Sequence, residues 1–238
     1  MRQDAVYLIL LPPAGGSSAS YMIWRENFSC HVVTLEYPGH GTRMGEPCAR
    51  NMDSLALDLY QEIMRRLPAG AQVLLFGYSM GGMMALILSH MIEEKKSFHL
   101  LGLVAAACLP PWSHNGKVDE TVRYLVDENP LTARAKTSPL YQKYVLPLLR
   151  NDIEMIEHYQ AHLFSCLHIP IWCLYGDNDL LVDLEKLPLW KNETKASVTF
   201  IPFSGNHFFV IKEQEQVCKK IQDVILFLKR NGDVHVRN

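Results

Sequence analysis

Short apolar runs alternate with segments of helical periodicity along most of the chain. The runs lie at 5–11, 31–36, 72–76, 100–107, 169–175 and 197–202. Each is mostly hydrophobic, which is typical of strands buried on both faces of a parallel sheet. The alternation of strand and helix therefore predicts an α/β fold with a mostly parallel central sheet and helices on both faces.

Two of the predicted helices have clear boundaries. The first has apolar residues at 52, 55, 59, 63 and 67, with Asn51 as its N-cap and the Pro-Ala-Gly of 68–70 as its stop. The last has an apolar face at 217, 221, 224, 225 and 228, and Asn231-Gly232 should end it.

One interval breaks the alternation. Between 110 and about 168 no strand is predicted, and helical segments occur near 118–127, 139–149 and 152–163. Ser138 followed by Pro139 is a suitable cap and first turn for the second segment. A crossover between strands usually needs one helix, so we expect a single domain spanning 1–238 with a helical lid at about 110–168.

Composition narrows the class of protein. The chain has 238 residues, of which 48% are hydrophobic and 20% charged, with a formal net charge of −2. Its charge gives no positive potential that would attract nucleic acid, and no polybasic stretch would bind anionic lipid. No apolar run is long enough to cross a membrane. The six cysteines form no C-x-x-C pair. We expect a cytoplasmic protein that binds neither nucleic acid nor membranes.

The candidate nucleophile is Ser79. The apolar run ending at 76 leads into Gly-Tyr-Ser-Met-Gly at 77–81, and a helix-favouring apolar segment follows. G-x-S-x-G at a strand-to-helix turn is a nucleophile elbow, which raises the serine hydroxyl above the sheet. Gly77 and Gly81 flank it because side chains there would collide. An incidental serine in a glycine-rich turn is the alternative.

An acid and a histidine follow in the order that this fold requires. Asp177 and Asp179 come directly after the run 169–175, and His207 lies in the loop between the last strand and the last helix. On these grounds either Asp179 or Asp177 is a candidate for the acid. Asn206, directly before His207, tolerates left-handed backbone and should preserve the geometry of this loop.

Backbone amides are the expected oxyanion donors. The amide of Met80 follows the nucleophile, and Ala14 or Gly15, in the glycine-rich loop after the first strand, offers a second donor, with Ala14 preferred. No phosphate-binding glycine motif and no metal motif are present: His158 and His162 lie one turn apart but lack a third ligand.

These segments together resemble the type II thioesterases that serve polyketide and nonribosomal peptide synthases. The resemblance rests on the loop at 12–16 with Trp24, the segment Tyr-Pro-Gly-His-Gly-Thr-Arg at 37–43, the elbow at 77–81, and Pro-Leu-Leu-Arg-Asn-Asp at 147–152 with Tyr159. It implies an α/β-hydrolase that removes acyl groups from the phosphopantetheine arm of carrier proteins. It also implies Asp179 as the acid, no cofactor beyond the arm that the substrate carries, carrier domains as partners and a monomer.

Two other functions remain open on the sequence alone. A carboxylesterase or lipase would use the same three residues on free esters. A non-catalytic binding protein with a hydrolase fold is disfavoured, because serine, acid and histidine all occur in order. The sequence does not indicate which acyl group is preferred.

Overall fold

The sheet of this protein is fully parallel and contains all six predicted strands. The computed structural model describes residues 5–113, 118–132, 134–160 and 164–235. The strand order is β2-β1-β3-β4-β5-β6, and every neighbouring pair is parallel. The strands are β1 Val6–Leu11, β2 His31–Thr34, β3 Gln72–Tyr78, β4 His99–Ala106, β5 Ile171–Gly176 and β6 Val198–Phe203.

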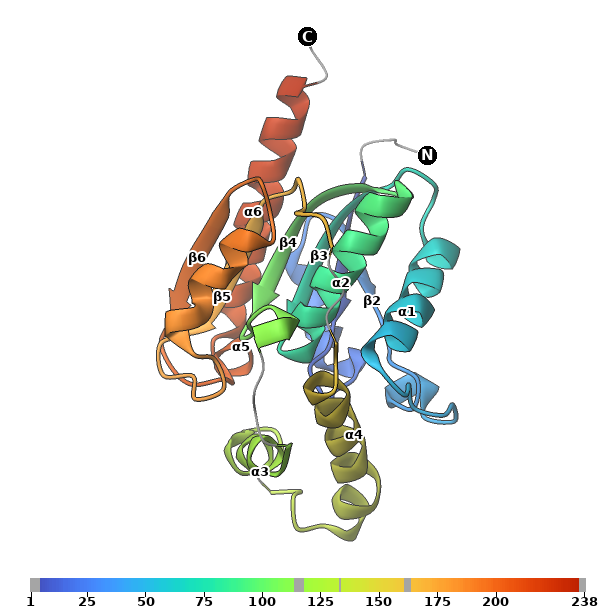
Figure 1. Cartoon of the computed structure of the whole chain (residues 1–238), viewed down its shortest axis with the longest axis vertical. Helices are drawn as coiled ribbons and strands as arrows, with labels where there is room; N and C mark the ends of the chain where they lie inside the picture. The colour runs from blue at the N-terminus through green and yellow to red at the C-terminus, as the bar shows by residue number, and fades with distance from the viewer. Residues whose placement is uncertain (1–4, 114–117, 133, 161–163, 236–238) are drawn as a thin grey trace.

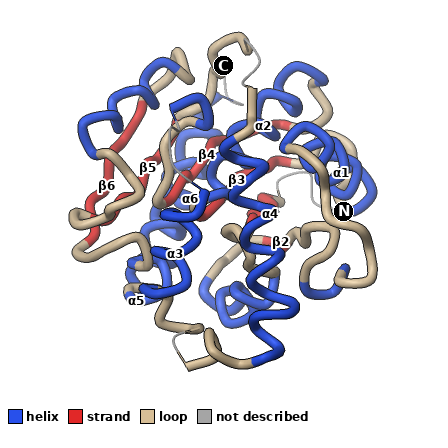
Figure 2. The backbone as a smooth tube through the Cα atoms, turned by 60° about the horizontal axis from the view of Figure 1, so that its bottom comes forward, coloured by secondary structure: helices blue, strands red, loops and turns tan. Residues whose placement is uncertain are grey.

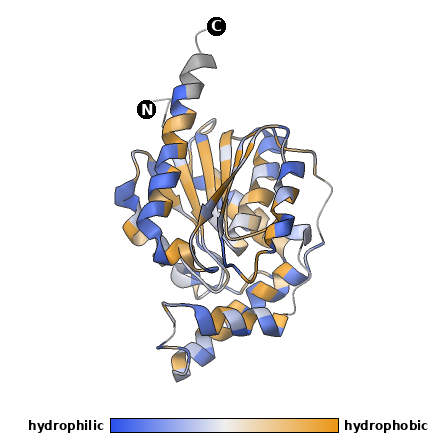
Figure 3. Cartoon of the chain, turned by 90° about the vertical axis from the view of Figure 1, so that its left-hand side faces the viewer, coloured by the Kyte–Doolittle hydropathy of each residue, from blue (hydrophilic) through white to orange (hydrophobic). Residues whose placement is uncertain are grey.

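Helices cover both faces of the sheet (Figure 1). Successive strand residues point to opposite faces, so Ile9 and Leu11 pack with α1 Met52–Arg66 and α2 Met80–Lys95, whereas Leu8 and Leu10 pack with η1 Ser18–Asn27 and α6 Gln214–His235. Figure 3 shows the strands as a mostly hydrophobic layer between helices with hydrophilic outer surfaces. The prediction of an α/β fold with helices on both faces is confirmed.

The boundaries of α1 and α6 differ in how well the sequence predicts them. The side chain of Asn51 caps α1 by accepting a hydrogen bond from the Ser54 amide at 2.8 Å, as expected. The predicted stop at Asn231-Gly232 is wrong, because α6 continues to His235. Glycine in a helix interior costs only about 1 kcal/mol relative to alanine, which weakens the last turn without ending it. In the described parts of the chain, no helix combines the length and the apolar character needed to cross a bilayer.

Helices fill the interval between β4 and β5, at one end of the sheet (Figures 1 and 2). They are η3 Pro111–Ser113, α3 Val118–Glu128, the π-helical turn η4 Tyr141–Val145 and α4 Leu146–Glu157. Ser138 accepts a hydrogen bond from the amide of Tyr141 at 3.1 Å, so it caps the helix as predicted. Short helices also follow β2, β5 and β6, namely η2 Gly41–Arg43, η5 Leu184–Asn192 and α5 Phe209–Lys212.

The two helices predicted at 139–149 and 152–163 are a single helical run, from 139 to 157. The backbone stays helical through the predicted gap at 150–151, and the Asp152 side chain that follows it is fully buried. The run ends where the amide of His158 bonds the carbonyl of Glu154 at 3.0 Å. The last predicted positions, 161–163, lie outside the described residues.

A buried carboxylate lies far from the sheet end that carries the insertion helices. Glu193 is 6% exposed, and its Oε2 lies 4.0 Å from Nε2 of His90, which stacks on Phe164. Burial raises the pKa of Glu193 to about 7 and lowers the pKa of His90 to about 4. His90 is therefore neutral near pH 7 and provides no countercharge.

Replacing Glu193 with Gln should stabilise the protein at alkaline pH. The raised pKa means that folding favours the protonated carboxyl, so stability falls as pH rises from about 4.5 through about 7. Gln mimics the protonated form and should add roughly 2–3 kcal/mol at pH 8 but less than about 1 kcal/mol at pH 5. Urea unfolding at both pH values measures this. Glu185→Gln, an exposed site on η5, is the matched control; an equal effect of Glu193→Gln at both pH values would contradict the prediction.

Candidate active site

Ser79 occupies a strained turn between β3 and α2. Its φ is +55° and its ψ is −120°, a conformation that non-glycine residues rarely adopt. A Cβ at Gly77 would collide with the carbonyl oxygen of Gly81, and one at Gly81 would lie 2.6 Å from the carbonyl oxygen of Pro12. Both glycines are therefore required for the tight turn, as the sequence predicted.

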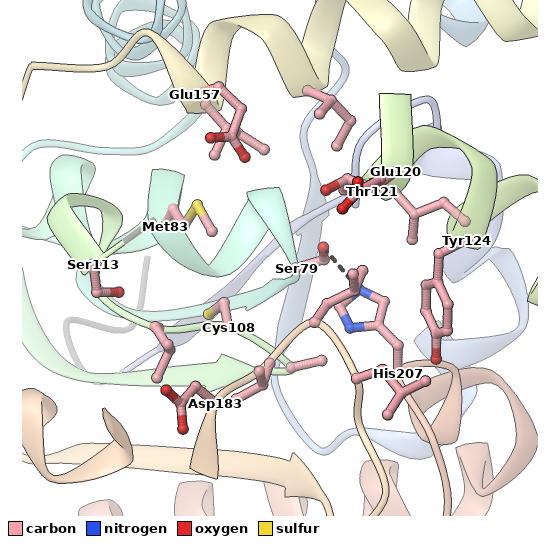
Figure 4. Close-up of a pocket in the computed structure, with 18 of the residues that line it drawn as sticks. Ser79, Met83, Cys108, Ser113, Glu120, Thr121, Tyr124, Glu157, Asp183 and His207 are labelled. Carbon is pink, nitrogen blue, oxygen red and sulfur yellow. Dashed lines mark hydrogen bonds between the residues drawn. The ribbon is translucent and has the colours of Figure 1, made fainter. Parts of the chain in front are cut away.

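The structure brings Ser79, His207 and Asp179 into one line of hydrogen bonds (Figure 4 shows the first). Oγ of Ser79 lies 3.0 Å from Nε2 of His207, and Nδ1 of His207 lies 2.8 Å from Oδ2 of Asp179. An ionised carboxylate only accepts, so Nδ1 carries the proton and Nε2 can accept the proton of the serine hydroxyl. The three side chains have the geometry of a serine nucleophile, its general base and the group that orients the base.

The two candidate carboxylates make different contacts. Asp179 is buried, and its Oδ1 accepts a hydrogen bond from the Leu181 amide at 2.8 Å, which orients Oδ2 toward His207. Asp177 is exposed, and its Oδ1 accepts from the Gly205 amide at 2.7 Å. Asp177 therefore links the loop after β5 to the loop between β6 and α5, residues 204–208, which carries His207 (the histidine loop). Asp179, in contrast, contacts the imidazole.

The histidine loop is held by contacts that the sequence did not reveal. The hydroxyl of Tyr78 donates to the carbonyl of His207 at 3.1 Å, and the two rings lie 5.6 Å apart. Asn206 does not take the left-handed backbone offered as the reason that it would preserve this loop, because the residue with positive φ here is Gly205, at φ +119°. Asn206 instead accepts a hydrogen bond from the Phe208 amide through its side chain at 3.2 Å.

The loop after β1 lies against the start of α2, because the backbone of Gly81 closely approaches the carbonyl oxygen of Pro12. The amide of Gly15 is already bonded to Oδ2 of Asp152 at 2.7 Å, and the amide of Gly16 is bonded to the carbonyl of Pro13 at 3.0 Å. Within the described part of the chain, the Ala14 amide has no acceptor. Of the two amides considered, Ala14 is thus the one available to a ligand.

Two cavities meet at Ser79 and His207. The larger, about 420 Å³, is lined by mostly apolar side chains, with Met83 from α2, Leu125, Ile153 and Ile156 from the insertion, and Val182 from the loop after β5. The charged side chains of Glu120 and Glu157 also line it (Figure 4). The smaller, about 60 Å³, is lined by Ala14, Gly15 and Tyr141 among others. The serine hydroxyl is therefore reached from two sides, which suits a substrate that extends in both directions from its reacting carbonyl.

Two further cavity residues bear on the chemistry. The Cys108 thiol also lines the larger cavity, but burial and then the charge of Asp179 raise its pKa, so the nucleophilic thiolate does not form. Tyr124 of α3 reaches down to the histidine loop and stacks on Phe208, with ring centroids 6.3 Å apart (Figure 4). Its position among helical residues gave no signal of this contact in the sequence.

Comparison with known proteins agrees with the geometry. Residues 7–225 match the thioesterase domain family. The chain is 26% identical to the thioesterase PikA5 of Streptomyces venezuelae, over 98% of this chain and 85% of that protein. The crystal structure of ClbQ from the colibactin NRPS/PKS pathway is similar, with a TM-score of 0.87, 29% identity and coverage of 94% of this chain and 98% of that one.

A second solved structure gives the same result. The type II thioesterase BorB from the borrelidin biosynthetic cluster has a TM-score of 0.77 and 28% identity, covering 92% of this chain and 90% of that one. The family match spans most of the chain and includes every candidate catalytic residue. The chain therefore belongs to the thioesterase domain family and is a thioester hydrolase with the α/β-hydrolase fold.

Proposed function

We propose that this protein is a type II thioesterase that removes acyl or aminoacyl groups from the phosphopantetheine arms of carrier proteins, and so clears stalled or wrongly primed carriers of a polyketide or nonribosomal peptide synthase. The observation that carries the proposal is the hydrogen-bonded line of Ser79, His207 and Asp179 at the junction of two cavities. The names of two similar structures, ClbQ from the colibactin NRPS/PKS pathway and the type II thioesterase BorB from the borrelidin biosynthetic cluster, support the same choice.

In the proposed acylation step, Ser79 attacks the thioester carbonyl while His207 takes its proton. The carbonyl oxygen gains a negative charge, which the amides of Met80 and Ala14 stabilise. The C–S bond then breaks and the imidazolium returns its proton to the pantetheine sulfur. A thiol has a pKa near ~8.5, so this leaving group needs less help from an acid than an alkoxide does.

Deacylation follows the same course, with water as the nucleophile and Oγ of Ser79 as the leaving group. His207 takes a proton from water as the water oxygen attacks the acyl-enzyme carbonyl, the tetrahedral species expels Oγ of Ser79, which receives the proton back from the imidazolium, and the acid product leaves. Asp179 keeps the imidazole in the required tautomer through both steps. No cofactor takes part, since the substrate itself carries the phosphopantetheine.

The helical insertion is the proposed lid and the proposed place where a carrier influences access. Side chains of α3 and α4 line the larger cavity, so movement of either helix changes its shape. Helical lids of this kind gate access and complete sites. The carrier surface lies remote from the reacting carbonyl, and its binding energy is available to seat the acyl chain.

We expect kcat/KM to be higher for substrates that keep more of the natural carrier-bound thioester. For one acyl chain, kcat/KM should be highest on acyl-carrier protein, lower on acyl coenzyme A and lowest on the N-acetylcysteamine thioester, because each truncation removes remote binding energy. Steady-state kinetics on the three thioesters, with a matched oxygen ester beside them, measures this order.

The control is Asp183→Asn, a change at the exposed rim of the larger cavity, which should leave the order unchanged. Equal kcat/KM for the carrier-bound and truncated thioesters would refute the carrier-clearing function. Preference for the oxygen ester would indicate a carboxylesterase instead.

A further inference from the structure

A buried ion pair joins the helical insertion to the core, outside the line of Ser79, His207 and Asp179. Asp152 of α4 is fully buried, and its Oδ2 lies 3.0 Å from Nε2 of His40, which is 2% exposed. The two residues are 112 positions apart in the sequence. Burying two charges costs several kcal/mol for each ion before pairing. Apolar side chains could make a purely structural contact here with a smaller desolvation free energy.

The surroundings of His40 require both of its nitrogens to donate. Nδ1 lies 3.0 Å from the carbonyl oxygen of Pro38, and Nε2 faces the carboxylate of Asp152. Both neighbours are acceptors, so only the doubly protonated imidazolium satisfies them. Burial alone lowers the pKa of His40, but the hydrogen bond and charge of Asp152, with Pro38 and Glu36, outweigh it and leave that pKa raised.

The same oxygen of Asp152 holds the loop that carries Ala14. Oδ2 accepts a hydrogen bond from the Gly15 amide at 2.7 Å. Gly15 has a φ of +64°, and a Cβ there would lie 2.9 Å from Cβ of Leu149, so α4 rests directly on this backbone. The position of α4 and the conformation of the loop are thus linked.

Successive peptide planes of this loop are each fixed by one contact. The Tyr37 hydroxyl donates to the carbonyl of Pro12 at 2.7 Å, and the Gly16 amide donates to the carbonyl of Pro13. In a trans peptide, C=O and N–H point in opposite directions, so the bond to Pro13 also sets the direction of the Ala14 amide. Asp152 fixes the next plane, between Ala14 and Gly15.

We propose that Asp152 and His40 are positioning residues that hold the Ala14–Gly15 peptide, and with it the Ala14 amide, in the orientation that binds the oxyanion. The inference rests on the proposed function, because it takes Ala14 as an oxyanion donor. His40 pairs with the Asp152 carboxylate and keeps it directed at Gly15, and neither residue touches the substrate. The oxyanion site is then complete when α4 packs against the backbone of Gly15.

The test compares Asp152→Asn with the double variant His40→Leu/Asp152→Ala. The double variant has nearly the same side-chain volume without charge, and apolar replacement of a buried ion pair is often neutral for stability. We expect its kcat to fall about 10- to 100-fold with KM within about threefold, since a misdirected donor acts in the transition state. Asp152→Asn keeps an oxygen for Gly15 and should lose less.

The measurement uses the thioester that the wild-type enzyme hydrolyses fastest, with active sites counted by stoichiometric labelling of Ser79 and folding followed by thermal denaturation. Glu154→Gln removes a carboxylate from an exposed position of α4 and should behave as wild type. A folded double variant with wild-type kcat per labelled site would overturn the proposal. So would a fall in labelled sites with unchanged kcat per site, because that indicates a structural role only.

Failure of the proposed function would be visible in the wild-type enzyme itself, as a preference for free oxygen esters. The same variants would then be compared on that ester, because both reactions develop an oxyanion at the same carbonyl oxygen.

Discussion

Ser79→Ala is expected to lower kcat by roughly four to six orders of magnitude, because it removes the hydroxyl that His207 activates and no acyl-enzyme can then form at this position. The hydroxyl lies 3.0 Å from its base, and the one thiol in the same cavity, Cys108, is kept protonated by burial. Steady-state hydrolysis of an acyl thioester measures the loss. A serine-directed phosphonate, followed by peptide mass spectrometry, should label Ser79 in the wild-type enzyme and no residue in the variant.

Ser113→Ala is the matched control. Ser113 also lines the larger cavity, but its hydroxyl donates to the carbonyl of Pro110 at 2.6 Å and does not contact His207. This variant should keep activity near wild type. Activity retained in Ser79→Ala, with the label found on another serine, would refute the mechanism.

Asp179→Asn is expected to lower kcat by about 10⁴-fold, the second largest effect. An amide NH₂ facing Nδ1 favours the imidazole tautomer whose proton lies on Nε2, and that nitrogen then cannot accept the proton of Ser79. Asp177→Asn should cost less than about tenfold, because the amide oxygen can still accept from Gly205, which is the contact that Asp177 makes.

The two aspartate variants serve as controls for each other, since they lie in one loop and lose the same charge. Both should be compared by kcat, by KM and by thermal denaturation. A larger loss of kcat for Asp177→Asn would transfer the orienting role to Asp177.

The sequence determined the order of elements and the identity of the candidate nucleophile. Buried parallel strands read as apolar runs, and all six were found within a few residues of their expected ends. The elbow was predictable because its requirement is local: a strained Ser79 between two residues that must lack a Cβ, Gly77 and Gly81. His207 and the pair of aspartates followed from their order after the strands.

Helix boundaries were less predictable, because tertiary packing overrides local signals. A gap between two helices was predicted at 150–151, but α4 continues through it, and Asp152 packs against His40 in the core. Asn231-Gly232 predicted a stop, but α6 continues through it to His235.

The choice between carboxylates and the arrangement of the oxyanion loop depended on the tertiary structure. Asp177 and Asp179 are two residues apart and chemically identical, and only folding reveals that one bonds Gly205 while the other bonds His207. Asp152 contacts Gly15 across 137 positions of sequence. A local pattern can specify a turn, because the turn's constraints lie between neighbouring residues; it cannot specify a hydrogen bond between distant segments, because their relative placement is set by packing of the whole core.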